Sequence, residues 1–288
     1  MQGIEIPRPE KELFADGTTK GDLATYYADV ARRMLPHLRD RVVSMQRFPD
    51  GVEAGGFYEK RVPGHFPDWV RRARVDTDDG SQEQVVVQDA RTLAYLAGQA
   101  CITPHTWLSR VERPTRPDQM VFDLDPSVDD LAAVRRATRL TGDLLGELGL
   151  PAYLKTTGSR GYHVVVPLRA ELDFDEVRDV AHRVAALLAR REPDLLTVEQ
   201  RTSERGDRVF VDYLRNGYGQ TAVPPYAVRA RERPSVATPI PWDDLGRVRP
   251  DQYTVGRPRR GADPWQGMRR RATGLRRARQ RLDRLEED

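Results

Sequence analysis

Two aspartates one residue apart, Asp123 and Asp125, lie in an apolar run that stops at Pro126. The run has the composition of a β-strand, and side chains alternate between the two faces of a strand. The two carboxylates therefore share one face, while Phe122 and Leu124 point to the other. Like charges at such close positions are unfavourable unless a cation neutralises them, and oxygen ligands suit magnesium or manganese.

A third carboxylate, Asp212, repeats this pattern, since it lies alone in an apolar run between Val211 and Tyr213. Three such carboxylates suffice for a two-metal phosphoryl-transfer site, in which the ions activate an attacking hydroxyl and clamp the leaving oxygen. A structural alternative is that Asp123 and Asp125 cap the following turn and that Asp212 pairs with a buried arginine. The D-x-D pair alone would also serve a nuclease, a glycosyltransferase or a phosphatase.

A glycine-rich turn at residues 155–163 joins two apolar runs. Its N–H groups, hydroxyls and cations could bind a triphosphate, through Thr157, Ser159, Arg160 and Gly161. The turn is not a Walker loop, because the G-K-[ST] end and the following helix are absent. A plain β-turn with a surface arginine is the alternative.

Two histidines and two arginines are further candidates for phosphate contacts. His105 and His163 could donate to phosphate oxygens, although an isolated histidine is more often a structural hydrogen-bonding group. Arg229 and Arg231 alternate like strand residues and could both face an anion. In a chain whose 47 basic residues include only four lysines, solvated arginines are the alternative.

The composition limits the class of protein. The 288 residues, 39% apolar and 32% charged, are too apolar for a disordered chain and enough for one large domain or two intimate subdomains. The single cysteine, Cys101, excludes an intramolecular disulfide, so a metal would be held by oxygen or imidazole. Neither a membrane helix nor a signal peptide is recognisable, which predicts a cytoplasmic protein.

The elements that must position these side chains follow from hydrophobic periodicity and capping residues. Across residues 120–214 the order strand, helix, strand, turn, strand, helix, strand predicts a mixed sheet with helices on one face. Helices are expected at 21–38, 90–100, 129–148, 174–190 and 268–288, and strands at 42–46, 56–60, 84–88, 120–125, 152–155, 163–167 and 208–214.

Together these segments resemble the polymerase domain of bacterial ligase D, a member of the archaeo-eukaryotic primase superfamily. The similarity runs from Lys11 to about Leu245, and the order and spacing of its motifs are specific. The motifs lie at residues 19–23, 26–27, 48–51, 56–60, 121–126, 155–158, 161–163, 209–213 and 225–231.

The resemblance implies an α/β (α+β) primase-polymerase fold over residues 1–288. An N-terminal α/β module, residues 1–110 plus C-terminal segments, is expected to pack on a modified RNA-recognition-like catalytic module at 115–235. The active site would lie in the cleft between these modules. A charged C-terminal helix is expected at 265–288.

The resemblance also implies a DNA or RNA polymerase that fills gaps or extends ends at DNA breaks. It would use two manganese or magnesium ions and would prefer ribonucleoside to deoxyribonucleoside triphosphates. The three aspartates would hold the ions. The incoming nucleotide would be bound by His105, Thr157, Ser159, Arg160, Gly161, His163, Arg229 and Arg231.

Two further groups of residues would contact DNA. Lys11 and Lys20 would grip the 5′-phosphate of the downstream strand, with Arg8 as a third cation, and Phe57 and Tyr58 would stack on a template base. Arg8 departs from the usual family residue, as do Gln46, Arg160 and Arg215. These departures bear on phosphate recognition and sugar selectivity.

The expected partners are gapped or broken DNA with a 5′-phosphate and, in the cell, Ku and a separate ATP-dependent ligase at the nucleoid. The absence of a K-x-D-G motif means that this chain is not itself the ligase. A primase that starts chains de novo is the alternative within the superfamily. A non-catalytic DNA-end-binding partner of a ligase is the alternative from another class, and a nuclease would have little use for a triphosphate site.

Overall fold

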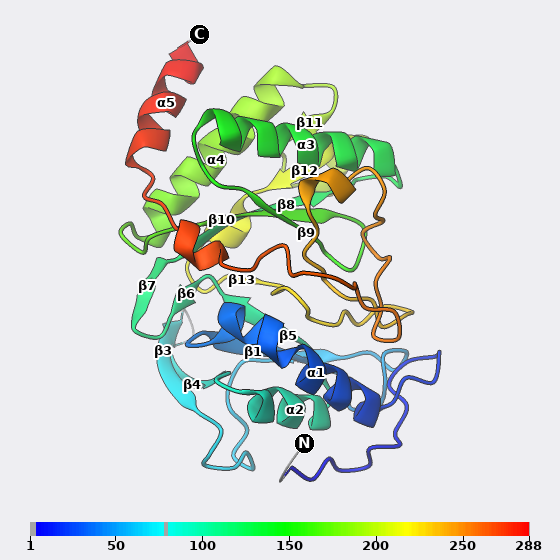
Figure 1. Cartoon of the computed structure of the whole chain (residues 1–288). Coiled ribbons are helices and arrows are strands. Elements are labelled where there is room, and N and C mark those ends of the chain that lie inside the picture. Colours follow the sequence, from blue (N-terminus) through cyan, green and yellow to red (C-terminus); the bar gives the residue numbers. More distant parts are fainter. Residues whose placement is uncertain (1–3, 78–79, 288) are drawn as a thin grey trace. The chain divides into compact units, whose positions relative to one another are not determined.

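The computed structural model describes residues 4–77 and 80–287 (Figure 1). Its contacts divide the chain into two compact units. Unit 1 comprises Met1–Pro114, Thr221–Thr238 and Asp251–Gly261, and unit 2 comprises Thr115–Gln220, Pro239–Pro250 and Ala262–Asp288. Each unit is therefore assembled from three separate stretches of chain. Among the described residues, no helix is both long and apolar enough to span a membrane.

Unit 1 is built on an antiparallel sheet with the strand order β13-β5-β1-β4-β3, and β2 pairs with β1 off this path. A further pair, β6 and β7, forms a two-stranded sheet, and the chain enters unit 2 within β7. The elements are α1 (Lys20–Leu38), β1 (Val42–Arg47), β2 (Phe57–Glu59), β3 (Arg72–Thr77), β4 (Gly80–Val86), α2 (Ala90–Gly98), β5 (Cys101–Trp107), β6 (Ser109–Arg110), β7 (Arg113–Pro117) and β13 (Thr221–Ala222).

Helices α1 and α2 pack against each other in the core of unit 1 (Figure 1). α1 begins with a capping box, in which the side chains of Thr19 and Asp22 accept from each other's backbone N–H groups. Tyr27 is fully buried on this helix. Its hydroxyl donates to the Ile102 carbonyl oxygen at 2.6 Å and accepts from the Val228 N–H at 3.0 Å. One side chain thus connects α1 to β5 and to the segment that follows β13.

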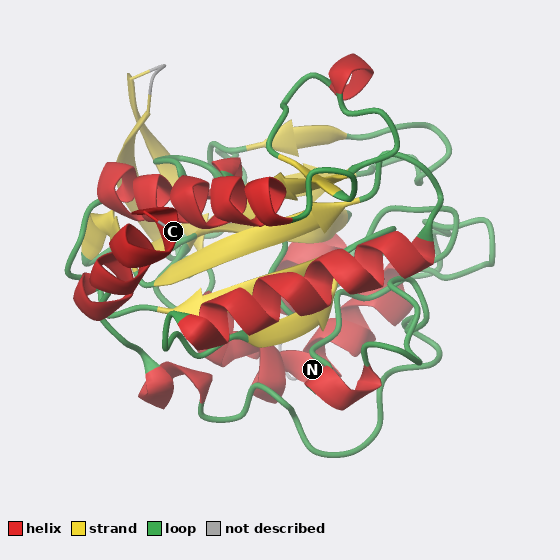
Figure 2. Ribbon diagram, turned by 90° about the horizontal axis from the view of Figure 1, so that it is seen from above, coloured by secondary structure: helices red, strands yellow, loops and turns green. Residues whose placement is uncertain are grey.

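Unit 2 is a five-stranded mixed sheet with the order β11-β12-β8-β10-β9, in which only the β11–β12 pair is parallel. Two long helices, α3 and α4, lie on the same side of this sheet (Figures 1 and 2). The elements are β8 (Gln119–Asp125), α3 (Leu131–Glu147), β9 (Tyr153–Thr156), β10 (Tyr162–Pro167), α4 (Phe174–Arg191), β11 (Leu196–Thr197), η1 (Thr202–Glu204), β12 (Val209–Asp212), η2 (Leu214–Asn216), η3 (Trp242–Asp244), η4 (Met268–Arg271) and α5 (Arg276–Glu287).

The expected strands and helices of residues 120–214 are confirmed, as is the mixed sheet with helices on one face. Five strands of unit 1 were not expected: β3, β5, β6, β7 and β13. β3 has a mostly polar sequence and pairs antiparallel with β4, from Arg72 opposite Val85 to Thr77 opposite Gly80. β5 is buried at all seven positions and contains Pro104, so its sequence has neither alternation nor an uninterrupted apolar run.

The C-terminal helix is shorter than expected, because α5 begins only at Arg276. The preceding chain is extended and bound to the end of β10: the Thr273 N–H donates to the Pro167 carbonyl oxygen, and the Arg169 N–H donates to the Thr273 carbonyl oxygen. The sequence of residues 268–288 shows no evident apolar stripe, but α5 has a buried face. Ala278 and Leu282, four residues apart, are buried on one face of α5.

A buried asparagine joins the helical turn η2 to β8. Asn216 has no exposed surface; its Oδ1 accepts from the Val121 N–H at 2.8 Å, and its Nδ2 donates to the carbonyl oxygens of Val121 and Tyr213. β12 ends just before η2, so this contact fixes where the chain leaves the sheet.

We expect Asn216→Ala to lower the free energy of unfolding by about 2–4 kcal/mol, because both backbone groups of Val121 lose their buried partner. Urea titration followed by circular dichroism measures this change. Gln200→Ala, at an exposed position in the same unit, is the control and should change stability by less than about 0.5 kcal/mol. An equal, small effect of both substitutions would contradict the structural role of Asn216.

Candidate active site

The two aspartates of β8 lie on the same face of the unit 2 sheet, as expected. Phe122 and Leu124 have no exposed surface and point to the opposite face, where α3 and α4 contact β8. Asp123 and Asp125 are therefore on the face that these helices leave uncovered, and their side chains are only partly buried. The apolar residues on one side of β8 thus hold the two carboxylates in place on the other.

The strand register brings Asp212 to the same place. Asp212 on β12 is directly opposite Asp123 on β8, Asp123 is opposite His163 on β10, and His163 is opposite Lys155 on β9. Directly opposed residues on neighbouring strands share a face and lie within contact distance. We call Asp212, Asp123, His163 and Lys155 the four-strand row. It places two anions, Asp212 and Asp123, beside two potential cations, His163 and Lys155, across four strands.

Specific contacts orient the carboxylates of this row. The His163 Nε2 atom lies 3.1 Å from Asp123 Oδ2. The Leu214 N–H donates to Asp212 Oδ1 at 2.8 Å, and the Arg215 Nε atom lies 3.3 Å from Asp212 Oδ2. Among the described residues, the buried Oδ1 atom of Asp123 has no hydrogen-bond partner. A carboxylate oxygen buried in this way is suited to a cation.

Mutual repulsion and burial shift the three carboxyl groups in different directions. Burial raises the pKa of Asp123, but the charge and hydrogen bond of His163, with the charges of Arg215 and Lys155, bring that pKa down to about 2. The charge of Asp123, followed by burial and the charge of Asp212, raises the pKa of Asp125 to about 7. Burial also raises the pKa of Asp212, against the charge of Arg215. Near neutral pH the cluster resists carrying three negative charges by itself.

The three carboxylates do not form a complete cation site on their own. Within the part of the chain that the structure describes, no group of three or more His, Cys, Asp or Glu side chains is arranged to enclose a metal ion. Magnesium and manganese sites in nucleotide-binding proteins commonly take only one or two carboxylates from the protein and the rest of their ligands from phosphates and water. The partnerless Asp123 oxygen and the like-charged Asp125 fit such a partial site.

The glycine-rich turn differs from the expectation that its N–H groups bind an anion. The Thr157 hydroxyl accepts from the N–H groups of Ser159 and Gly161 and donates to the Gly161 carbonyl oxygen. The N–H groups of Thr157 and Gly158 donate to the carbonyl oxygens of Gly161 and Pro250. These N–H groups are used to hold the turn closed. The turn presents side chains instead, and the exposed Arg160 lowers the pKa of Asp125 through its charge.

Gly161 has a steric role beside the carboxylates. A Cβ atom at this position would lie 2.1 Å from the Leu124 carbonyl oxygen and 3.6 Å from Asp125 Oδ1. Such contact with the backbone cannot be relieved by a side-chain movement. Gly161 therefore permits the close approach of β10 to β8 at the carboxylates.

Two basic residues of the site were not among the expected site residues. Lys155 is 1% exposed and belongs to the four-strand row, and Arg215 contacts Asp212. The sequence carried a signal for Lys155, because it is one of only four lysines in an arginine-rich chain. Arg215 is noticeable only as a departure from the family pattern.

The remaining candidates for nucleotide and template contacts lie in unit 1. The Tyr58 hydroxyl lies 3.4 Å from the Nε2 atom of buried His105, which is also 3.4 Å from Gln46 Oε1. Phe57 and Tyr58 are 47% and 56% exposed, which leaves their rings accessible for stacking. Arg229 and Arg231 lie in the segment after β13.

The segment that carries the two arginines is irregular rather than part of a strand. Val228 forms an isolated β-bridge with Val236, and the Arg229 N–H donates to the Ser235 carbonyl oxygen. Arg229 is partly buried and Arg231 is exposed. The two side chains therefore differ in accessibility.

The structure brings the three candidate phosphate-binding cations together in unit 1. The backbone N–H of Lys20 donates to the Lys11 carbonyl oxygen, and Lys20 Nζ donates to the Pro7 carbonyl oxygen at 2.9 Å. Burial, followed by the charges of Arg8, Lys11 and Arg47, lowers the pKa of Lys20. Lys11 is paired with the exposed Asp50 at 2.9 Å. The result is a concentration of positive charge at the start of α1.

Comparison with known proteins identifies the class. The family model of the LigD primase-polymerase domain matches residues 19–265. The chain therefore belongs to this family of nucleotidyltransferases, and the expected α/β fold of such domains is confirmed by a solved structure.

That structure is the "Polymerase Domain from Mycobacterium tuberculosis Ligase D in complex with DNA", with a TM-score of 0.82, 32% identity, and coverage of 100% of this chain and 99% of the other. The multifunctional non-homologous end joining DNA repair protein LigD of Mycobacterium tuberculosis is 35% identical over 85% of this chain, and LigD of Pseudomonas aeruginosa is 34% identical over 91%. The chain spans about a third of the length of these relatives, 34% and 32%.

The raised pKa of Asp125 predicts the stability of the metal-free protein. A carboxyl with a pKa of about 7 when folded and about 4 when unfolded binds its proton more tightly in the folded state. The wild type therefore loses stability as the pH rises from about 4 to 7. With a chelator present, we expect Asp125→Asn to raise the free energy of unfolding by about 2 kcal/mol or more at pH 8, and by less at pH 5.

Urea titrations at the two pH values measure this difference. Asp129→Asn, at an exposed position just after β8, is the matched control. An Asp125→Asn gain that is the same at both pH values, or a loss at pH 8, would show that the neighbouring carboxylates do not act on Asp125.

Proposed function

We propose that this chain is a template-directed polymerase that adds nucleotides to a DNA strand at gaps or broken ends. The observation that carries the proposal is the convergence of Asp123, Asp125 and Asp212 on one face of two paired strands, in a chain of the LigD primase-polymerase family. The neighbouring solved structure is a polymerase domain in complex with DNA, and the relatives are named as non-homologous end joining proteins.

The three aspartates would hold two manganese or magnesium ions together with the phosphates of a nucleoside triphosphate. When bound, such ions lower the pKa of the attacking 3′-hydroxyl and stabilise the leaving pyrophosphate oxygen. His163 orients Asp123, and Arg215 with the Leu214 N–H orients Asp212. Because of these contacts the carboxylates need little rearrangement when a substrate arrives.

The other residues are assigned to substrate contacts on the basis of the family resemblance. Arg160, Ser159 and Thr157 would contact the triphosphate with His163 and Gly161 beside them, and His105, Arg229 and Arg231 of unit 1 would also bind the nucleotide. Phe57 and Tyr58 would stack on a template base. A preference for ribonucleotides, and cellular cooperation with Ku and a separate ligase at the nucleoid, belong to the same proposal.

Primer extension on a gapped duplex tests the proposal. The assay compares ribonucleoside and deoxyribonucleoside triphosphates, with manganese or magnesium, and includes unprimed single strands. Addition to a primer and none without one supports the gap-filling polymerase, with manganese and ribonucleotides expected to give the higher rates. Dinucleotide synthesis on unprimed strands would favour a primase, and DNA binding without any addition would favour a non-catalytic end-binding module.

We expect alanine at Asp123, Asp125 or Asp212 to reduce nucleotide addition by at least about 100-fold, because each removes an oxygen ligand of the ions. DNA affinity, measured by fluorescence anisotropy, should change little, since cations elsewhere supply most of the attraction to phosphates. Asp129→Ala is the matched control and should retain activity. Substantial polymerase activity in any of the three variants would overturn the assignment.

The cation cluster of unit 1 predicts recognition of a terminal phosphate. A 5′-phosphate carries close to two charges. Lys11 and Lys20 meet at the start of α1, where the charge of Arg8 also acts on Lys20. Lys11→Ala and Lys20→Ala should each weaken binding to a 5′-phosphorylated gap by roughly tenfold or more, while affinity for the unphosphorylated gap barely changes.

Anisotropy titrations at one fixed salt concentration measure these affinities. Lys60→Ala removes the same charge from an exposed position and should have no phosphate-dependent effect. Because Lys20 is 5% exposed and bonded to the Pro7 carbonyl oxygen, Lys11→Ala is the variant less able to disturb the fold. Equal wild-type affinity for both gaps would remove the phosphate site.

A further inference from the structure

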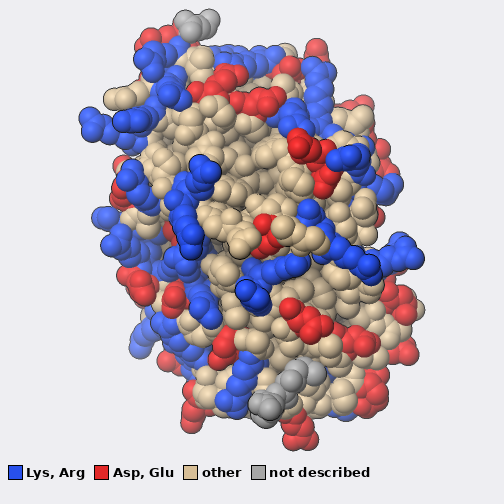
Figure 3. All heavy atoms as spheres, in the orientation of Figure 1, with Lys and Arg blue, Asp and Glu red and all other residues tan. Residues whose placement is uncertain are grey.

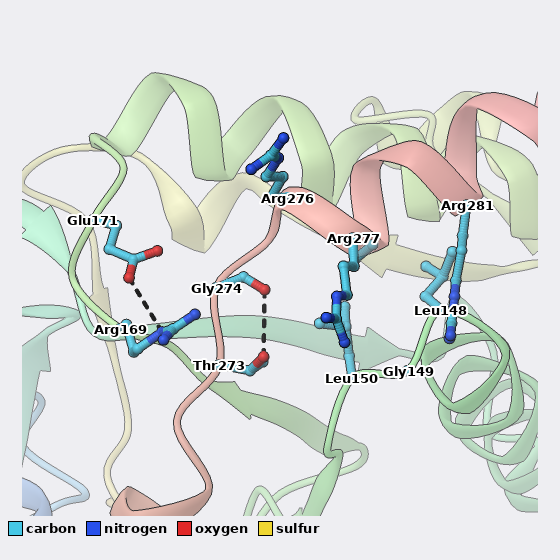
Figure 4. Close-up of a pocket in the computed structure, with 11 residues that line it drawn as sticks. Leu148, Gly149, Leu150, Arg169, Glu171, Thr273, Gly274, Arg276, Arg277 and Arg281 are labelled. Carbon is cyan, nitrogen blue, oxygen red and sulfur yellow. Dashed lines mark hydrogen bonds and ion pairs between the residues drawn. The ribbon is translucent and has the colours of Figure 1, made fainter.

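A cavity of about 510 Å³ lies in unit 2 between the end of α3, the segment after β10 and the start of α5 (Figure 4). This volume is within the usual range of ligand sites, roughly 300–1,000 Å³. It is lined by four arginines, Arg169, Arg276, Arg277 and Arg281, and by a single carboxylate, Glu171. We call it the arginine pocket. None of its lining residues belongs to the four-strand row or to the glycine-rich turn.

Most of the positive charge in the arginine pocket is not neutralised by the protein. Arg169 is paired with Glu171 at 3.1 Å. Arg281 donates from Nη1 to the Glu147 carbonyl oxygen at 3.1 Å, which leaves its other donors and its charge available. The side chains of Arg276 and Arg277 make no hydrogen bond or ion pair with any residue that the structure describes. Figure 3 shows basic side chains predominating at the upper left, where α5 lies in Figure 1.

The walls of the pocket are fixed by contacts outside it. Arg183 on α4 pairs with Asp283 and Glu286 on α5, and the α5 residue Leu282 is fully buried. Thr273 is bonded to the end of β10. Gly149 leaves room for Arg281, since a Cβ atom there would lie 2.5 Å from Nη1. The segments that carry the four arginines are therefore held in place by contacts with the rest of unit 2.

The arrangement of the arginines favours a ligand with several spaced negative charges. In Figure 4, Arg169 and Arg276 lie toward one end of the cavity, Arg277 lies near its middle, and Arg281 lies at the other end. A compact anion would need cations that converge on one point, whereas these are distributed along the cavity. Guanidinium groups bind phosphate oxygens in a two-pronged geometry.

We propose that the arginine pocket is a second nucleic-acid site, which binds two or more consecutive phosphates of a single strand. The inference rests on the proposed function, since a polymerase that acts at gaps or broken ends meets single-stranded DNA with accessible phosphates. No aromatic residue is among the described residues that line the cavity, so bases have no ring to stack on. The site therefore grips the backbone without reading the sequence.

Binding of a fluorescein-labelled 12-nucleotide oligo(dT) by the full chain tests the proposal. Arg276→Ala/Arg277→Ala should weaken binding by at least about tenfold at low salt and reduce the slope of log affinity against log salt by about 1.4, for two lost contacts to a single strand. Arg178→Ala/Arg284→Ala is the matched control. It removes two exposed helix arginines of unit 2 that lie outside the pocket and should change affinity less than about twofold.

A steric variant separates the pocket from general attraction to positive charge. Gly274→Leu fills the cavity and retains all four arginines. Its Cβ atom would meet only the mobile side-chain ends of Glu171 and Arg169, at 2.7 and 2.9 Å. The same loss of oligo(dT) affinity is expected, with an unchanged circular dichroism melting curve. Wild-type affinity in Gly274→Leu would overturn the proposal, even if the double arginine variant failed to fold.

Two readouts locate and identify the ligand. Oligo(dT) should slow hydrogen–deuterium exchange at residues 273–281 in the wild type and in Asp123→Ala, but not in Gly274→Leu. Inorganic tripolyphosphate and poly-L-glutamate, added at matched negative charge, should displace oligo(dT) less well than unlabelled oligo(dT). Equal displacement by tripolyphosphate would show that the ligand is a compact anion and not a nucleic-acid strand. Equal displacement by polyglutamate would show that the ligand is an acidic protein segment. Either result overturns the proposal.

Failure of this inference differs from failure of the proposed function. A chain that extends primers, with unchanged oligo(dT) affinity and exchange in the pocket variants, would lack the second site and keep its activity. A chain that adds no nucleotide but is protected at residues 273–281 would have the arginine pocket without the polymerase.

Discussion

The repulsion among three carboxylates on one face of a sheet is the constraint on which the site depends. Asp123, Asp125 and Asp212 stay together only because the opposite face of β8 and β12 is buried against helices and because basic side chains lie beside them. Two of these basic groups contact a carboxylate directly: His163 contacts Asp123, and Arg215 contacts Asp212. The repulsion from neighbouring carboxylates is least offset by positive charge at Asp125, and the pKa of Asp125 is raised to about 7. The energy stored in this arrangement is what a divalent cation would release on binding.

Much of the site follows from local sequence because period-two alternation and strand pairing are local or nearly local properties. The shared face of Asp123 and Asp125 needs only the alternation of β8, and the isolated Asp212 is visible as a carboxylate in an apolar run. The opposition of Asp212 to Asp123 and of His163 to Asp123 needs the register of three strands. The family resemblance supplied that grouping before the structure did, since composition does not specify register.

Other features depend on contacts that no local pattern contains. From the sequence, the N–H groups of the glycine-rich turn could either bind an anion or bond within the turn. In the structure, the N–H groups of Ser159 and Gly161 donate to the Thr157 hydroxyl, which closes the turn. β5 was missed because tertiary burial permits Pro104 in a strand. The start of α5 was misplaced because Thr273 pairs with the end of β10, more than a hundred residues earlier in the chain. The arginine pocket arises from the same long-range docking, so four arginines that look like ordinary surface residues in the sequence are assembled only by the fold.

The interleaving of the two units bears on the order in which the protein is made. The hydroxyls of Tyr26 and Tyr27 in α1 find partners at Tyr226 and Val228, 200 and 201 residues later, and β13 joins its sheet only after all of the unit 2 strands have been synthesised. At about 5–20 residues per second, a ribosome needs roughly 10–40 seconds to cover that interval. During this time the edge of β5 that pairs with β13 has no partner strand, and the hydroxyls of Tyr26 and Tyr27 lack their partners at Tyr226 and Val228. The amino-terminal unit is therefore begun first and completed late, and its exposed strand is the part of the nascent chain that most needs protection from association with other chains.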